Sequence, residues 1–95
     1  MKLSCRRDEL LGAVQLAGLT VPKRHINETL DNRFLLRAGK SVSISATDYN
    51  VYVEYSLVPD AAEVEEGGEL LLPLDKLVQL LRESSDEWVV LDRFE

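Results

Sequence analysis

Cysteine is almost missing from this 95-residue chain: Cys5 is the only one, so no disulfide can form within the chain. Such usage is typical of proteins in a reducing cytoplasm. Long apolar runs are missing as well, since the longest, the leucines at 70–72, is far shorter than the ~20 residues that span a membrane. The first residues contain no apolar core of signal-peptide length. We therefore expect a cytoplasmic protein without a membrane anchor.

Positive charge is also scarce. The chain has 11 lysines and arginines against 17 aspartates and glutamates, which gives a formal net charge of −6. This balance disfavours non-specific attraction of nucleic acid to the average surface, but it does not exclude a local basic face. A length of 95 residues allows one domain, or part of one.

Signatures of catalysis and of metal binding are lacking. His25 is the only histidine, and a zinc site would need several cysteine or histidine ligands. The glycine pair at 67–68 is not followed by the lysine and helix of a phosphate-binding loop. Cys5 alternates with Leu3, which favours a place in the core over a role as nucleophile. We therefore predict a protein that is not an enzyme and that has no cofactor and no metal.

Apolar periodicity predicts the first elements of the chain. Alternation over 1–6 indicates a strand, and the period then changes to that of a helix over 7–18. The expected apolar stripe of this helix consists of Leu10, Leu11, Val14 and Ala17. Gly18 is suited to its end, whereas Gly12 inside it costs about 1 kcal/mol relative to alanine.

Three strands are predicted in the middle of the chain. Segments 33–37 and 41–47, joined by a turn at 38–40, read as a hairpin. In the stretch SVSISATDYNVYVEYSL, Thr47-Asp48 interrupts a regular apolar alternation. Because aspartate side chains hydrogen bond to nearby backbone, we interpret this dipeptide as a turn that leads into a third strand at 51–57. A functional site at Thr47-Asp48 is the alternative.

The last third of the chain is expected to begin with an acidic loop over 58–68, whose glutamates are solvated. A strand at 69–72, a helix at 73–84 and a strand at 87–92 follow. The apolar stripe of this second helix is predicted to be Leu74, Leu77, Val78 and Leu81.

An internal repeat is visible in the two strand-to-helix junctions. KLSCRRDELLGAVQ and ELLLPLDKLVQLLR share one plan at a constant offset of 67 residues, which also relates Asp8 to Asp75. The repeat predicts an α+β chain in which a β-α-β-β-β half over 1–57 precedes an incomplete β-α-β half over 69–95. Chance agreement between two such junctions is the alternative.

Three stretches, in their order and spacing, resemble one known family. MKLSCRRDELLGAVQLAG, the RFLLRAG to SVSISATD hairpin and LLLPLDKLVQLLRESSDE resemble the N-terminal domain of the bacterial DNA polymerase III beta subunit, the sliding clamp. ISATDYN at 44–50 corresponds to the family's Leu-x-Leu-x-Ala/Gly-Thr-Asp-Leu-Glu stretch. Pro73 to Lys76 corresponds to the Pro-x-x-Lys that opens its second helix. The resemblance spans 1–95.

The resemblance implies a DNA-clamp fold, with two helices packed on antiparallel sheet, and a non-catalytic function in DNA replication. Clamp domains join into a ring around duplex DNA, with helices lining the hole and sheets forming the outer wall. The ring tethers the replicative polymerase, so DNA polymerase III subunits and the clamp loader are implied partners. It further implies a truncated domain, because the last two strands and the later domains that hold the polymerase-binding cleft are not in the sequence.

Five residues are implied to lie near DNA. Arg24 matches a basic position after the first helix, with Lys23 beside it, and Lys76 and Arg82 match basic positions on the second helix. Gln79 lies between these two at a spacing of three, on the face away from the apolar stripe. That placement suits phosphate contacts without base readout. The basic residues of this set would together neutralise about three phosphates, so a plot of log binding constant against log salt concentration would have a slope of roughly −3. A plain solvated helix face and a plain surface loop are the alternatives.

Two departures from the family pattern support a different function. Gly12 stands where the family usually has a basic residue, and Asp75 where some members have one. The alternative is a small protein–protein interaction module that keeps the clamp half-fold without DNA binding. The edge of the strand at 87–92 would then accept a strand from a partner or a second copy. A homo-oligomer is compatible with either function.

Overall fold

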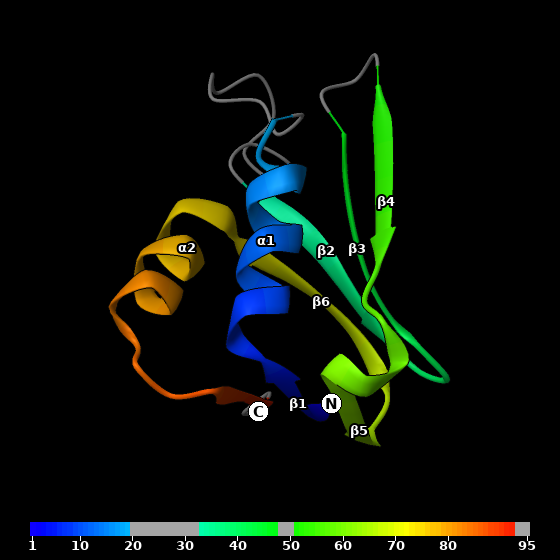
Figure 1. The fold of residues 1–95 in the computed structure, drawn as a ribbon. Coiled ribbons are helices and arrows are strands. Elements are labelled where there is room, and N and C mark those ends of the chain that lie inside the picture. The colour runs from blue at the N-terminus through cyan, green and yellow to red at the C-terminus, as the bar shows by residue number, and fades with distance from the viewer. Residues whose placement is uncertain (20–32, 48–50, 93–95) are drawn as a thin grey trace.

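The structure is a computed structural model that describes residues 1–19, 33–47 and 51–92 (Figure 1). These residues form seven strands, two α-helices and one short 3₁₀ helix. In chain order the elements are β1 (Lys2–Arg6), α1 (Arg7–Ala17), β2 (Arg33–Ala38), β3 (Val42–Thr47), β4 (Tyr52–Ser56), the 3₁₀ helix η1 (Pro59–Ala61), β5 (Ala62–Glu66), β6 (Gly68–Pro73), α2 (Leu74–Glu83) and β7 (Trp88–Asp92).

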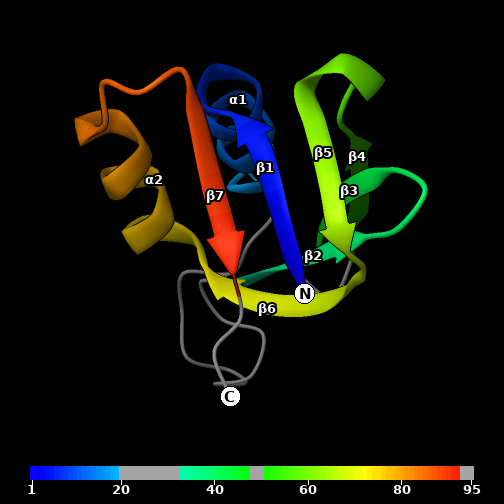
Figure 2. The ribbon, with the colours of Figure 1, turned by 90° about the horizontal axis from the view of Figure 1, so that it is seen from below.

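The strands form two antiparallel sheets. One has the order β5-β1-β7 and the other the order β4-β3-β2-β6. Figure 2 shows the first sheet from below, with β1 between its two partners. Helix α1 packs against β1 of this sheet and against β3 and β4 of the other. Helix α2 packs on α1 and β6, so the expected α+β arrangement of two helices on antiparallel sheet is confirmed.

The core lies between the two sheets and around α1. Its largest fully buried side chains are Phe34, Leu3, Leu10, Leu36, Ile44, Val14 and Cys5. The expected stripe of α1 packs into the core, with Leu11 half-buried against it, and Ala13, which was not expected, is buried as well. Since α1 is covered by two sheets and by α2, its buried arc is wider than the single stripe that an amphipathic helix needs.

The expected loop over 58–68 is wrong, because most of it forms η1 and strand β5. In β5, Val64 pairs with Leu3 and Ala62 pairs with Cys5. Their side chains are half-buried, whereas the intervening glutamates are exposed. The acidic residues are therefore solvated as predicted, but they sit on a strand that β1 recruits by hydrogen bonding.

The turn expected at Thr47-Asp48 agrees with the pairing of its flanking strands. Thr47 is the last residue of β3 and lies opposite Tyr52, the first residue of β4, in an antiparallel pair. The chain therefore reverses between them, and Asp48 itself lies outside the described residues.

The two strand-to-helix units at the offset of 67 residues are placed reciprocally. β1 pairs with β7, the strand after α2, and β6 pairs with β2, the strand after α1. The two helices also meet reciprocally: Arg7 at the start of α1 contacts Leu81 near the end of α2, and Leu74 at the start of α2 lies where a Cβ at Gly18, after α1, would come within 3.3 Å of it. The division into halves at 1–57 and 69–95 stays a prediction.

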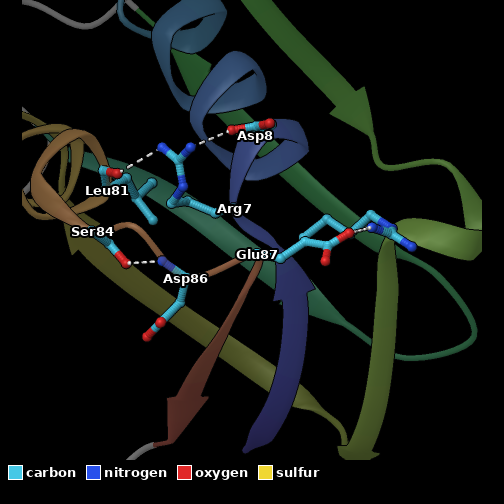
Figure 3. A network of polar contacts seen from close by, with 7 residues as sticks. Arg7, Asp8, Leu81, Ser84, Asp86 and Glu87 are labelled. Atoms are coloured by element: carbon cyan, nitrogen blue, oxygen red, sulfur yellow. Dashed lines mark hydrogen bonds and ion pairs between the residues drawn. The ribbon is translucent and has the colours of Figure 1, made fainter.

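Arg7 fastens α2 to α1 through polar contacts (Figure 3). Its Nη1 donates a hydrogen bond of 3.0 Å to the carbonyl of Leu81, and its Nη2 lies 2.7 Å from Asp8 Oδ1. Its backbone N–H donates to the carbonyl of Glu87 at 2.9 Å. In the described part of the structure its buried Nε has no partner. The Arg7 side chain thus joins the start of α1 to the last turn of α2, and its backbone N–H adds a hydrogen bond to the segment that leads into β7.

Candidate nucleic-acid interface

Three of the five residues expected near DNA are described, and all three lie on α2. Lys76, Gln79 and Arg82 are exposed. Lys23 and Arg24 lie outside the described residues, so their place relative to α2 stays a prediction.

Because the apolar side of α2 is buried, the opposite, polar face with Lys76, Gln79 and Arg82 is exposed to solvent. Leu74 and Leu81 are buried, and Leu77 and Val78 are half-buried. Pro73 precedes the first helical residue, where its missing N–H costs no intrahelical hydrogen bond. Asp75 in the first turn and Arg82 in the last turn both complement the helix dipole.

The polar face of α2 carries equal numbers of positive and negative charges. Glu83 follows Lys76 by seven residues and Asp75 precedes Arg82 by seven, and all four are exposed. Seven residues are nearly two helical turns, so each cation shares its row with an anion. Lys76 and Arg82 themselves point about 120° apart and lie about 9 Å apart along the axis. The face therefore offers two separate cations, each in line with a carboxylate about 10 Å away along the axis, and not one concentrated basic patch.

Helix α1, which packs beside α2, adds no exposed cation to the polar face of α2. Its only basic residue, Arg7, has a side chain that is 23% exposed and is held by Leu81 and Asp8. Gly12 and Gln15 are exposed and uncharged. The departure at Gly12 is thus a true gap in positive charge on the exposed side of α1.

A hydrogen bond holds α1 against the four-stranded sheet. The Tyr55 hydroxyl of β4 donates to Glu9 Oε1 of α1 at 3.2 Å. This hydrogen bond, with the negative charge of Glu9, raises the pKa of Tyr55. The carboxylate of Glu9 is therefore engaged with the sheet.

Basic side chains on the sheets are mostly neutralised by acidic neighbours. Lys2 lies 3.7 Å from Glu65. The shorter pairs are Arg6–Glu87 at 2.6 Å and Arg37–Glu69 at 2.9 Å. Among the residues that the structure describes, the basic side chains without an ion pair are Arg33, Lys40, Lys76 and Arg82. Two of these four lie on α2, which makes its face the natural candidate for phosphate contacts.

The described residues contain neither a metal-holding cluster nor an accessible thiol. Within 1–19, 33–47 and 51–92, no group of three or more histidine, cysteine or acidic residues could hold a metal ion. Cys5 is fully buried, and burial raises the pKa of its thiol to about 11, so it remains protonated and inaccessible. In this same part of the chain, no helix is both long enough and apolar enough to cross a membrane.

Sequence reasoning identified the cations of α2 and the acidic Asp75, but it missed Glu83, which shares a row with Lys76. The signal was present, because the spacing of seven residues between Lys76 and Glu83 can be read directly from the sequence. Only the observed burial of α2 establishes that both residues share the solvent-facing side.

Two kinds of comparison with known proteins lead to one family. Residues 1–93 match the family described as DNA polymerase III beta subunit, N-terminal domain. Among solved structures, pol III beta of Caulobacter crescentus is 29% identical with a TM-score of 0.85, and covers 97% of this chain and 24% of its own. The beta subunit of Pseudomonas aeruginosa is 24% identical with a TM-score of 0.86, over 100% of this chain and 25% of its own.

More distant structures keep the same fold. The beta subunit from the DNA polymerase of Streptococcus pyogenes is 11% identical, yet it has a TM-score of 0.90 over 100% of this chain and 25% of its own. Comparison with curated protein sequences gave no match. The chain spans about a quarter of the length of the solved structures that it resembles.

Proposed function

The chain belongs to the family of the DNA polymerase III beta subunit, in its N-terminal domain, and from this membership we propose that it is a clamp module that binds duplex DNA without sequence preference. Members of this family are sliding clamps, which are non-catalytic processivity factors of DNA replication, so the chain is not an enzyme. In the proposal, α2 approaches the phosphate backbone with Lys76 and Arg82, and Gln79 donates a hydrogen bond between them. Lys23 and Arg24 add phosphate contacts.

The observation that carries this proposal is the exposed, ion-pair-free placement of Lys76 and Arg82 on α2 in a chain of clamp fold. Lysine and arginine that contact only phosphates give binding that is independent of sequence and sensitive to salt. Because the exposed face of α2 carries as many carboxylates as cations, the affinity of one copy is expected to be weak. A ring of several copies, and the tethering of a polymerase, would add avidity that a single copy lacks.

The test is fluorescence anisotropy of a labelled 30-base-pair duplex over a range of salt concentrations. The first variant is Lys76→Glu with Arg82→Glu. The matched control is Arg33→Glu with Lys40→Glu, which changes the net charge equally but lies on β2 and on the β2–β3 turn. We expect a log–log salt slope of roughly −3 for the parent, loss of binding in the α2 variant, and near-parental binding in the control.

Equal weakening in both variants would mean that only bulk charge acts, and it would refute the α2 assignment. Ring formation has its own test in light scattering at several concentrations, with circular and with cut duplex. A fixed mass that is retained on circular DNA alone supports a clamp that closes by self-association. A monomer or dimer that is indifferent to DNA contradicts it.

The electrically neutral face of α2 and the uncharged exposed positions of α1 favour a second candidate, a protein–protein interaction module without DNA binding. In that case the parent shows no salt-sensitive duplex signal. A partner would bind the parent and the Lys76→Glu, Arg82→Glu variant with equal affinity. This pair of results separates the two functions.

A further inference from the structure

A small hollow lies on the outward face of the four-stranded sheet, on the side opposite the core. Its volume is about 170 Å³. The lining residues come from all four strands: Arg33, Phe34, Leu35, Ser45, Ala46, Thr47, Tyr52 and Leu71. The DNA contacts proposed above are on α2, so the hollow belongs to a different surface.

The register of the strands creates this hollow. Leu35 of β2 lies between Leu71 of β6 and Ser45 of β3. Because side chains alternate between the two faces of a strand, Leu35 and Leu71 point away from the core that Phe34 and Leu36 enter. Ser45 is small and only 8% exposed, so it forms a low floor beside two half-buried leucines. Two leucines on the outer face are not needed for the core, which makes them candidates for a binding role.

The rim of the hollow carries charges of both signs, Arg33 and Glu54, because a hydrogen bond from a hydroxyl leaves the carboxylate of Glu54 charged. Arg33 is exposed and makes no ion pair or hydrogen bond with any described residue. The other arginine of this face, Arg37, is already held by Glu69 at 2.9 Å. Glu54 accepts a hydrogen bond of 3.1 Å from the Tyr52 hydroxyl. The group at the rim that is ready to receive a partner is therefore the guanidinium of Arg33, which matches a carboxylate.

We propose that this hollow docks an extended segment of a partner protein, with one leucine-sized side chain inserted between Leu35, Leu71 and Tyr52 and an adjacent acidic residue on Arg33. A cavity of about 150 Å³ is enough for a benzene-sized group, so the hollow holds one such side chain and not a larger ligand. The docking is independent of duplex binding, because it uses the outer face of the sheet. A single anchor with one ion pair gives weak affinity, on the order of millimolar.

The experiment is a titration of the isotope-labelled protein, followed by amide chemical shifts in solution NMR. The probe is the peptide acetyl-Ala-Leu-Asp-Ala-amide, and its neutral isostere is acetyl-Ala-Leu-Asn-Ala-amide. We expect saturable shifts at the amides of Leu35, Ser45 and Leu71, and affinity about three-fold higher for the aspartate peptide. In Arg33→Gln this preference disappears, while in the matched control Lys40→Gln it persists.

Three results would overturn the proposal. The first is the absence of shifts at these amides up to 20 mM peptide. The second is equal affinity of the parent for both peptides. The third is a set of shifts at the same amides on dilution of the protein without peptide, which would make a second copy the occupant. Unchanged amide shifts of Leu3 and Leu91 in the other sheet verify that the Arg33→Gln variant is folded.

Discussion

Replacing Arg7 by methionine tests the contact that joins the two helices. Methionine keeps an unbranched apolar stem but removes the guanidinium, which donates to the Leu81 carbonyl at 3.0 Å. A hydrogen bond from a charged donor contributes about 1.5–3 kcal/mol, and a cation at a helix C-terminus about 0.3–1 kcal/mol. Removal also relieves the buried Nε that has no partner in the described structure, which offsets part of the loss. We expect the free energy of unfolding to fall by about 1–2 kcal/mol.

Urea denaturation measures this loss. A chain of this size has an m-value of about 1–1.5 kcal/mol per molar urea, so the midpoint should fall by about 1 M. Arg37→Met is the matched control, because the same substitution there removes only an exposed pair with Glu69. Its effect should remain below that of Arg7→Met, since exposed ion pairs contribute about 0–1 kcal/mol.

Amide hydrogen exchange shows which part of the molecule loses stability in Arg7→Met. The Ser84 N–H donates to the Leu80 carbonyl at 3.1 Å in the last turn of α2, next to the carbonyl that Arg7 binds. Its protection should decrease in Arg7→Met and remain in Arg37→Met. A midpoint for Arg7→Met within about 0.3 M of the parent, with Ser84 protection unchanged, would refute the reasoning.

Three further predictions concern α1 and the core. A Cβ at Gly12 would meet no atom within 4 Å, so Gly12→Ala should raise the free energy of unfolding by about 0.5–1 kcal/mol in urea melts; a lower midpoint would contradict this. Gly12→Lys adds a cation to α1 and should steepen the salt slope of duplex binding by roughly 0.9, whereas the uncharged control Gly12→Gln should not. Burial raises the pKa of the Cys5 thiol from 9.0 to about 11; because the unfolded thiol ionises first, the stability that it contributes is present below pH 9 and is lost as the pH rises from 9 to 11. Urea midpoints over this range should fall more steeply for the parent than for Cys5→Ala, and equal slopes would show that the thiol does not contribute.

Most elements were predictable because their signals are local. The strand at 1–6, the hairpin from Arg33, and α2 each show a clear apolar period, and Pro73 and Gly18 mark helix ends. Strand β5 was missed for a physical reason. Its glutamates have low strand propensity, and the strand exists because β1 offers it hydrogen bonds and covers Ala62 and Val64.

The candidate sites were predictable only in part. Lys76 and Arg82 follow from helical periodicity, and their exposure on α2 agrees with it. The neutral balance of that face depends on which sides of both helices are buried, which is a tertiary property. The hollow beside Leu35 could not be predicted, because it arises from the pairing of Leu35 with Ser45 on one side and Leu71 on the other. Such pairings join residues that are distant in the sequence.

The reciprocal pairing of the strands also affects the order in which the chain can fold as it is synthesised. β1 is made first, but both of its neighbours come late: Leu3 pairs with Val64 and with Leu91. At synthesis rates of about 5–20 residues per second, β1 waits several seconds or more for its second neighbour. During this time its apolar residues need temporary cover, which α1 can supply as soon as it forms. The four-stranded sheet is complete once β6 has been made, so it is expected to be the first folded part of the molecule, with β7 joining last.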